Sequence, residues 1–248
     1  HCSMMKRMTL IAGFLLLCSE GFSAVPDRIT PPPGWETDTM QRVLGIDVSV
    51  HQGKIEWAQV KENGVRFAYI KATEGKDYVD KRYAENTRQA RQEGIATGAY
   101  HFFLFNTSGR EQADHFIRTV QLQKGDLPPV VDVEAYRNPH RNLSDRAITA
   151  SVQVFVYKIY NHYGIWPVIY ADMASYKRYI RGYFPGCPLW LCDLNKEPAP
   201  DDGRGWLFWQ YAHTGRMKGI SGPVDLDIFR GTPEDFSKFL NKTSGSDL

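Results

Sequence analysis

Regular alternation between short apolar segments and helix-like segments constrains the fold of this chain most strongly. The apolar segments read as strands and the segments between them as helices. The predicted strands cover residues 43–49, 66–73, 95–103, 129–135 and 168–172, and the predicted helices cover residues 55–63, 81–93, 109–123 and 144–163. Alternation at this spacing is typical of β-α-β units. The sequence therefore predicts an α/β fold with a parallel sheet.

The pattern changes after residue 185. Three strand-like runs follow at residues 189–192, 206–211 and 224–229, with loops between them, and a closing helix is predicted for residues 233–240. Eight strands in total suggest a barrel whose last part lacks its helices. A chain of 248 residues is long enough for one such domain.

The N-terminal segment has the pattern of a secretory signal peptide. Lys6 and Arg7 precede an apolar run that is too short to span a bilayer comfortably. We therefore predict a signal peptide at residues 1–24, a proline-rich linker at residues 25–42 and the barrel domain at residues 43–242. The protein is expected to be exported to the periplasm or out of the cell, with no membrane segment in its mature form.

Charge and cysteine content exclude some classes of function. The formal net charge is only +2 and no polybasic run occurs, so the sequence gives no support to nucleic-acid binding. Cys187 and Cys192 remain after signal removal, and their pairing, which needs a bend near Pro188, stays open. Two cysteines are too few for a tetrahedral zinc site. We predict neither a metal nor a cofactor.

Two carboxylates interrupt the apolar segment at residues 128–135. Because side chains alternate between the faces of a strand, Asp132 and Glu134 are predicted to share one face, with backbone positions about 6.5–7 Å apart. Val131 and Val133 are expected to face the helices. Two carboxylates on one face of an apolar strand are costly to bury unless they are paired or used. They are therefore a candidate acid/base pair.

Polar side chains also gather at the ends of the other predicted strands. Active sites of β/α barrels lie at the carboxyl ends of the strands. The residues at these positions are Asp47, Ser49, Lys71, Glu74, Tyr100, His101, Tyr170, Asp172, Trp209, Gln210, Tyr211, Asp225 and Asp227. These positions contain more acidic residues than the stability of a barrel mouth requires. We therefore expect acids from several strands to meet there.

Seven short motifs in this chain together resemble a known family. They are GIDVS at residues 45–49, QG at 52–53, IKATEG at 70–75, GAYHF at 98–102, DVE at 132–134, WQY at 209–211 and VDLD at 224–227. In this order they are similar to the glycoside hydrolase family 25 lysozymes, the Chalaropsis-type muramidases. The resemblance covers about residues 43–240. It implies a flattened, incomplete TIM-like (β/α) barrel with five β/α units followed by three strands.

The resemblance also implies an activity and four acidic site residues. The activity is hydrolysis of the β-1,4 bond between N-acetylmuramic acid and N-acetylglucosamine in peptidoglycan. The four site positions of the family match Asp47, Asp132, Glu134 and Asp225 in this chain. The last motif of the family often ends in Asn, where this chain has Asp227.

Glu134 is the candidate general acid. Glycoside cleavage needs a protonated carboxylic acid beside the leaving oxygen, and the neighbouring Asp132 disfavours a second negative charge. We expect Asp132 to position and polarise the acetamido group of the substrate. Asp47 and Asp225 are expected to stabilise the oxocarbenium-like state. The choice between retaining and inverting hydrolysis, and the identity of the nucleophile, stay open.

Several aromatic and polar residues are candidates for substrate binding. They are Tyr69, Lys71, Glu74, Tyr100, Tyr170, Trp209 and Gln210. Aromatic rings stack on sugars, but they pack a core equally well. Tyr100 and Tyr170 are favoured because they lie near the predicted mouth. Trp190, Tyr211, His51 and His101 are further candidates that equally suit a structural role.

Two other functions compete with a secreted muramidase. One is a chitinase-like hydrolase, which also uses an Asp-x-Glu pair but usually has further acids upstream, where this chain has Pro128, Pro129 and Val130. The other is a glycan-binding module without turnover, against which the retention of all four acids argues. The expected partner is the peptidoglycan glycan strand, and the protein is expected to be a monomer.

Overall fold

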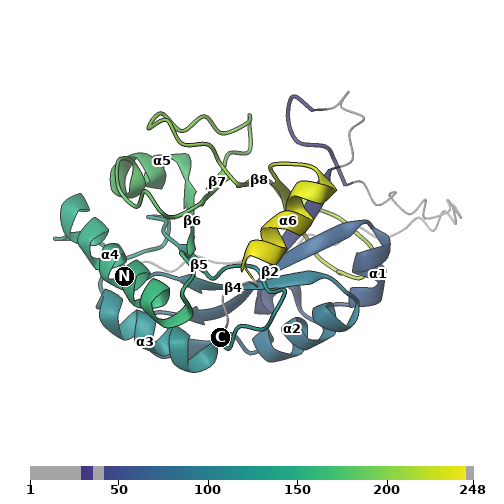
Figure 1. The fold of residues 1–248 in the computed structure, drawn as a ribbon, viewed down its shortest axis with the longest axis horizontal. Coiled ribbons are helices and arrows are strands. Elements are labelled where there is room, and N and C mark those ends of the chain that lie inside the picture. Colours follow the sequence, from purple (N-terminus) through teal and green to yellow (C-terminus); the bar gives the residue numbers. More distant parts are fainter. Residues whose placement is uncertain (1–28, 36–41, 244–248) are drawn as a thin grey trace, which may run out of the picture.

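A nine-stranded sheet forms the centre of the computed structural model, which describes residues 29–35 and 42–243 (Figure 1). Its strands are β1 (Val43–Val48), β2 (Val65–Glu74), β3 (Tyr78–Val79), β4 (Ala96–Phe102), β5 (Val130–Asp132), β6 (Val168–Asp172), β7 (Leu189–Cys192), β8 (Phe208–Gly215) and β9 (Val224–Phe229). Because β1 pairs with both β2 and β9, eight strands close into a barrel and β3 lies at an edge beyond β2. The predicted TIM-like α/β barrel is confirmed.

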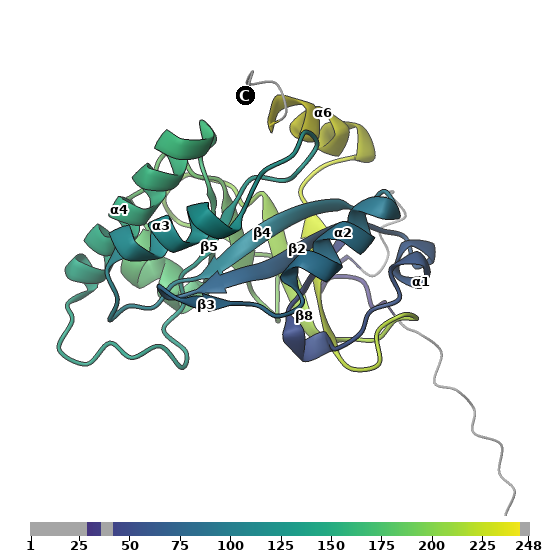
Figure 2. The same ribbon diagram turned by 90° about the horizontal axis from the view of Figure 1, so that it is seen from below.

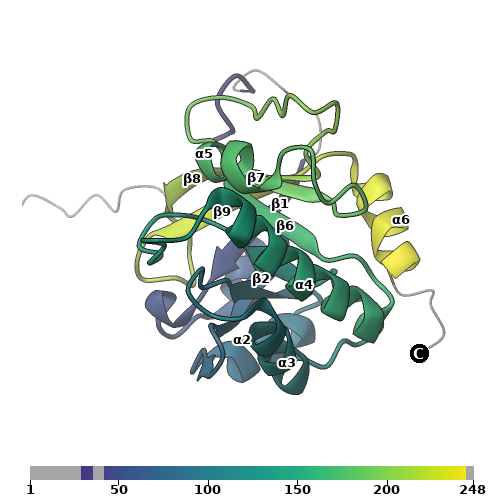
Figure 3. The same ribbon diagram turned by 90° about the vertical axis from the view of Figure 1, so that its left-hand side faces the viewer.

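Helices cover this barrel unevenly. The helical elements are η1 (Val50–Gln52), α1 (Trp57–Glu62), α2 (Tyr83–Gln92), α3 (Gly109–Thr119), α4 (Asp145–Tyr163), α5 (Met173–Ser175), the π-helix η2 (Tyr176–Ile180) and α6 (Pro233–Thr243). Figure 2 shows α1 to α4 packed along one side, and Figure 3 shows α5 beside β7. Within the described residues no helix lies between β7 and β8 or between β8 and β9. None of the described helices is long and apolar enough to cross a bilayer.

The last strand closes the barrel in the opposite direction to its neighbours. β1, β2 and β4 to β8 run parallel, but β9 is antiparallel to both β8 and β1. The amino end of β9 therefore lies beside the carboxyl end of β1, and Asp225 is the register partner of Asp47. This reversal brings Asp225 to the same end of the barrel as the acids of the parallel strands.

Local sequence signals set the helix limits. In α4, the Ser144 side chain accepts a hydrogen bond from the Ala147 N–H at 3.1 Å, and the helix ends at Gly164 with φ of 70°. Its apolar residues Ile148, Val152, Phe155, Val156 and Ile159 recur at helical spacing and are buried in the core. The segment at residues 129–135 forms a shorter strand than predicted. Val133 N–H still donates to the Tyr170 carbonyl at 2.9 Å, but the loop then turns away.

Glycines make room for large aromatic rings inside the barrel. A Cβ at Gly45 would lie 2.2 Å from the Phe67 ring, and a Cβ at Gly98 would lie 2.2 Å from the Tyr69 ring. Both rings are fully buried. The barrel interior is therefore filled by aromatic side chains that require glycine on the neighbouring strands. A second apolar layer, which includes Val131 and Val133 as expected, lies between the sheet and the helices.

The predicted signal peptide lies outside the described residues, and only part of the predicted linker is described. In that part, Trp35 packs edge-on against Trp209 with ring centroids 5.9 Å apart, and its Nε1 donates to Glu197 at 3.3 Å. Residues 29–35 are thus held on the barrel surface. Cys187 and Cys192 are both free and buried, so the pairing left open by the sequence is not present.

His101 lies at the centre of a buried hydrogen-bond network. Its Nδ1 is 2.7 Å from the Thr73 hydroxyl and its Nε2 is 2.9 Å from Gln112 Oε1. Gln112 also pairs with both backbone polar groups of Leu104. Because the amide oxygen can only accept, Nε2 carries the hydrogen and Nδ1 accepts from Thr73. Burial lowers the pKa of His101 to about 3, so the residue is neutral and structural.

We expect His101 to make the fold less stable in acid. An unfolded histidine has a pKa of about 6.5, so the folded state binds fewer protons and loses up to about 1.4 kcal/mol per pH unit as pH falls from about 6.5 toward 3. Urea unfolding of wild type and His101→Gln across this range measures the effect. The variant should lack this part of the slope, whereas the exposed His162→Gln control should retain it.

Candidate active site

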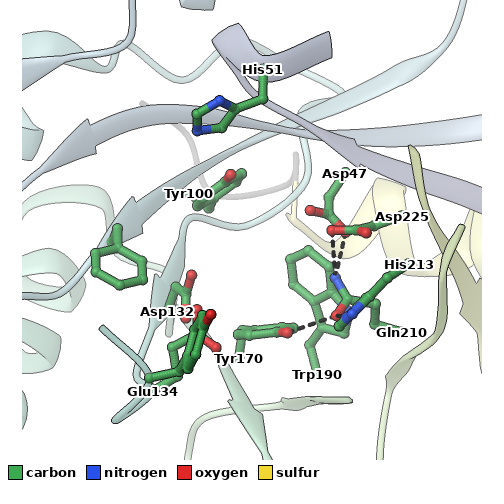
Figure 4. Close-up of a pocket in the computed structure, with 12 residues that line it drawn as sticks. Asp47, His51, Tyr100, Asp132, Glu134, Tyr170, Trp190, Gln210, His213 and Asp225 are labelled. Atoms are coloured by element: carbon green, nitrogen blue, oxygen red, sulfur yellow. Dashed lines mark hydrogen bonds between the residues drawn. The ribbon is translucent and has the colours of Figure 1, made fainter. Parts of the chain in front are cut away.

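A pocket of about 320 Å³ opens where the carboxyl ends of the parallel strands meet the amino end of β9 (Figure 4). It is lined by Asp47, His51, Tyr100, Phe102, Asp132, Glu134, Tyr136, Tyr170, Trp190, Gln210, His213 and Asp225. All four predicted catalytic acids line this single pocket. In Figure 4, Asp132 and Glu134 lie on one side and Asp47 and Asp225 on the other.

The end of β5 and the loop after it hold Asp132 and Glu134. Asn138 Nδ2 donates to the Glu134 carbonyl at 3.0 Å and to the Phe103 carbonyl at 2.7 Å. The Ala135 N–H donates to Ser175 Oγ at 3.1 Å. These bonds fix the backbone on both sides of Glu134, so its side chain is directed into the pocket by a braced loop rather than by the strand itself.

The surroundings of this pair favour the protonated state. Burial, together with the charges of Asp172 and Asp225, raises the pKa of Glu134 to about 7. Burial and the neighbouring Glu134 raise the pKa of Asp132. The Lys71 ammonium opposes both changes. Glu134 can therefore hold a proton near neutral pH, as a general acid must.

Gln210 organises the opposite side of the pocket. Its Nε2 donates to Asp47 Oδ2 at 2.7 Å and to Asp225 Oδ2 at 3.5 Å. Its Oε1 accepts from the Tyr170 hydroxyl at 2.7 Å and from His213 Nε2 at 2.9 Å. All polar atoms of the amide are engaged, so Gln210 links both acids to Tyr170 in one fixed arrangement (Figure 4).

Burial also raises the pKa values of the acids on this side. For Asp47 the largest cause is burial, followed by the charges of Asp225 and Asp227. For Asp225 burial raises the pKa and His213 opposes the rise. Acids that share a site in this way cannot all ionise freely. Despite their number, no three His, Cys, Asp or Glu side chains in the described part of the chain are arranged to hold a metal ion.

The predicted substrate-binding residues divide into three groups. Tyr100, Tyr170 and Gln210 line the pocket. Lys71 and Glu74 form an ion pair with an N–O distance of 2.6 Å, and Lys71 Nζ lies 5.2 Å from the centre of the Phe102 ring. These two residues therefore border the pocket behind Phe102 rather than line it.

Tyr69 and Trp209 form the third group and belong to the core. Tyr69 stacks on Trp190 inside the barrel with ring centroids 4.9 Å apart. The Trp209 ring packs on Trp35, and its Nε1 donates to the Asp193 carbonyl at 2.8 Å. Side chains alternate along β8, so the strand that turns Gln210 toward the pocket turns Trp209 outward.

Three lining residues were not predicted. They are Phe102, Tyr136 and His213. Phe102 lies two residues after Tyr100, and Tyr136 lies two residues after Glu134, so the alternation of strand positions was the available signal. Tyr136 is in a loop, 67% exposed, where that signal is weak. The pocket also includes His51 and Trp190, which were only secondary candidates.

The chain matches a family model described as "Glycosyl hydrolases family 25" over residues 46–220. This match covers more than half of the sequence. The chain belongs to the family 25 glycosyl hydrolases. It is therefore a glycosidase, and the predicted family membership is confirmed.

Individual relatives of this family 25 glycosyl hydrolase are similar over most of its length. It is 37% identical over 204 residues to the uncharacterized protein YegX of Escherichia coli K12. The aligned segment covers 80% of this chain and 74% of YegX. It is 35% identical over 238 residues to Lysozyme M1 of Streptomyces globisporus. This alignment covers 91% of this chain and 79% of Lysozyme M1.

Solved structures agree with this assignment. A family 25 glycosyl hydrolase from Bacillus anthracis superimposes with a TM-score of 0.76 and 36% identity, covering 82% of this chain and 94% of that structure. A bacterial lysozyme from Streptomyces coelicolor gives a TM-score of 0.76 and 34% identity, covering 82% of this chain and 99% of that structure.

Removing a nearby negative charge should lower the pKa of Glu134. Asp172 raises this pKa, and Asp172 also caps α5 by accepting from the Ser175 N–H at 2.8 Å. Asn can keep that cap while losing the charge, so Asp172→Asn should shift the titration of Glu134 below its value of about 7. Carbon-13 NMR of the Glu134 carboxyl measures the midpoint. An unchanged midpoint would show that the Asp172 charge does not raise this pKa, which would leave burial and Asp225 as its causes.

Proposed function

We propose that this glycosidase is a lysozyme-type muramidase that hydrolyses the β-1,4 bond between N-acetylmuramic acid and N-acetylglucosamine in peptidoglycan. The main support is Glu134, a carboxyl group in the pocket whose pKa is raised to about 7 beside the unpartnered, buried Oδ1 of Asp132. Similarity to Lysozyme M1 supports the substrate class. The roles below follow from the same contacts.

Glu134 acts first as the acid. Its proton passes to the glycosidic oxygen as the bond between that oxygen and C1 of N-acetylmuramic acid breaks. A carboxyl group with a pKa near 7 is about half protonated at neutral pH and is acidic enough to transfer its proton, which is close to the optimum for a general acid. After the leaving sugar departs, the Glu134 carboxylate removes a proton from the attacking water and regains its starting state.

Asp132 assists the acetamido group of the substrate. The acetamido oxygen attacks C1 and forms a cyclic oxazolinium ion, which water then opens to the free sugar. The amide N–H must be held and polarised for this attack. Asp132 Oδ1 is buried and has no hydrogen-bond partner in the structure, so it can accept from that N–H. The hydrogen bond from the substrate N–H favours the ionised form of Asp132, because hydrogen bonds to a carboxylate lower its pKa.

Asp47 and Asp225 provide negative potential across the pocket. The transition state of glycoside hydrolysis carries positive charge on the sugar ring. Both acids line the pocket, and Gln210 fixes Asp47 at 2.7 Å. Oriented carboxylates of this kind stabilise the developing charge without reorganising.

Aromatic residues provide the binding surface for the sugar rings. Tyr100, Tyr136, Tyr170 and Trp190 line the pocket, and Tyr136 is the most exposed of them at 67%. We assign sugar stacking to Tyr136 and orientation of the reacting sugar to Tyr170, whose hydroxyl is already fixed on Gln210. We further propose that the enzyme is exported by its signal peptide and acts on the wall as a monomer.

Loss of the acid should abolish hydrolysis and preserve binding. We expect Glu134→Gln to reduce clearing of a peptidoglycan suspension by about 100- to 10,000-fold, because general acid catalysis contributes a factor of that size. The variant should still sediment with peptidoglycan. Glu234→Gln on the exposed face of α6 is the matched control and should clear at the wild-type rate.

The products distinguish this proposal from its rivals. Mass spectrometry should find muropeptides with N-acetylmuramic acid at the reducing end. Cleavage of added chitin oligomers without release of muropeptides would indicate a chitinase-like enzyme instead. Equal inactivity of wild type and Glu134→Gln, with binding intact, would indicate a glycan-binding module.

Activity should fall as pH rises through about 7. Glu134 must be protonated to act as the acid, and its pKa is about 7. The basic limb of kcat/KM against pH should therefore have its midpoint near this value, and Asp172→Asn should move the limb to lower pH. A basic limb that stays at the same pH in Asp172→Asn, while the NMR midpoint of the Glu134 carboxyl falls, would contradict the assignment of this limb to Glu134.

A further inference from the structure

A distortion of β8 brings a histidine to the edge of the acidic pocket. His213 lies three positions after Gln210, and strict alternation along a strand would direct these two side chains to opposite faces. The pairing of β8 with β9 shifts register between Gln210 and Ala212 and again between Ala212 and Gly215. Such β-bulges re-aim side chains, often next to active sites. Here they bring the His213 ring to the Gln210 amide (Figure 4).

The imidazole of His213 donates a hydrogen bond to this amide. Its Nε2 is 2.9 Å from Gln210 Oε1 and 3.6 Å from Cys192 Sγ. Because an amide oxygen can only accept, Nε2 carries the hydrogen. The neutral tautomer with a hydrogen on Nε2 and the imidazolium both donate in this way. His213 is exposed, so packing of the core does not require its side chain.

The orientation of the Gln210 amide is linked to the ionisation of Asp47. The two ends of a glutamine amide have nearly the same shape but opposite hydrogen-bonding character. The NH2 end faces Asp47 Oδ2 at 2.7 Å and Asp225 Oδ2 at 3.5 Å. A turned amide would present its oxygen to these carboxyl groups. It could then bond to Asp47 only if Asp47 held a proton, because the amide oxygen carries no hydrogen.

Of the two groups at the other end of the amide, only His213 selects one orientation. The Tyr170 hydroxyl donates to Gln210 Oε1 at 2.7 Å, but a hydroxyl can equally accept from an NH2 group. Tyr170 therefore permits both orientations. The N–H of His213 can only donate, so it permits only the orientation with Oε1 toward His213 and NH2 toward Asp47.

We propose that His213 is a positioning residue whose Nε2–H fixes the Gln210 amide with its NH2 group toward Asp47, which keeps Asp47 as the carboxylate facing the pocket. This deepens the proposed function and rests on it for the role of Asp47. Burial raises the pKa of Asp47, and the hydrogen bond from Gln210 opposes this rise. Without a fixed amide, Asp47 should therefore hold a proton more often.

Two uncharged replacements of His213 test the donor. His213→Gln can place a side-chain N–H near the position of Nε2 and keep the bond to Gln210, whereas His213→Leu has no donor. On soluble peptidoglycan fragments, His213→Leu should lower kcat about 10-fold, the usual effect of losing one hydrogen bond, with KM changed less than about 2-fold. His213→Gln should restore most of the wild-type kcat.

The split between kcat and KM separates positioning from direct contact with the substrate. A raised KM at unchanged kcat in His213→Leu would overturn the proposal, because the ring would then bind the sugar rather than position Gln210. Equal losses of kcat in both variants would also overturn it, because the N–H donor would not be the feature required. Wild-type kcat in both would show that Tyr170 holds the amide without help.

Titration of Asp47 tests the same link without substrate. Carbon-13 NMR follows the Asp47 carboxyl in His213→Leu and His213→Gln, and because both replacements are uncharged, a difference between them reports the donor alone. The midpoint should lie about one pH unit higher in His213→Leu, which corresponds to the 10-fold loss of kcat. Both variants retain the titratable groups that interact with Asp47, which are Asp225, Asp227, Tyr100, Tyr170 and Cys192.

Equal midpoints in the two variants would mean that His213 does not control the Gln210 amide, and the proposal would be wrong. The titration needs no turnover, so its failure is distinguishable from failure of the proposed function. If wild type did not cleave peptidoglycan, the muramidase assignment would fall, while the two midpoints would still report how His213 acts on Asp47.

Discussion

Antiparallel pairing of β9 with β1 is the constraint on which the rest of this structure depends. Seven strands of the barrel run parallel, and a parallel eighth strand would place its amino end far from the pocket. Because β9 reverses, Asp225 lies in register with Asp47, and Asp227 lies one pleat deeper. The same pairing closes the barrel and completes the acidic pocket.

Closing the barrel in this way concentrates negative charge in a poorly solvated place. Asp47, Asp132, Asp225 and Asp227 are all buried or nearly so, and burial is the largest cause of the raised pKa of each. Lys71 is the cation that opposes this rise on the side of Asp132. Elsewhere N–H donors reduce the cost: the Gln210 amide donates to Asp47 and Asp225, and the Trp190 indole donates to Asp227. Burial of this kind raises the pKa of Glu134 to about 7, so the general acid can hold its proton near neutral pH, which is the condition that glycoside hydrolysis requires.

The sequence predicted the acids that line the pocket better than the residues that hold them in place. Asp132 and Glu134 were predicted to share a strand face, and both line the pocket, but β5 ends at Asp132 and a braced loop presents Glu134. Asn138, which braces that loop, had no signal in the sequence. Tyr69 and Trp209 were predicted to bind substrate, but both lie in the core. The sequence does not distinguish an aromatic residue on a strand that faces a sugar from one that faces the core.

Periodicity and the spacing of carboxylates determined the alternating elements, the barrel and the pair at residues 132–134. These are local properties, since side-chain alternation and helical spacing depend only on near neighbours in the chain. Tertiary structure alone decided the direction of β9, the link that Gln210 makes between Asp47 and Asp225, and the free state of Cys187 and Cys192. Each of these depends on segments distant in sequence. The protonation of the acids depends on burial, which only the folded chain creates.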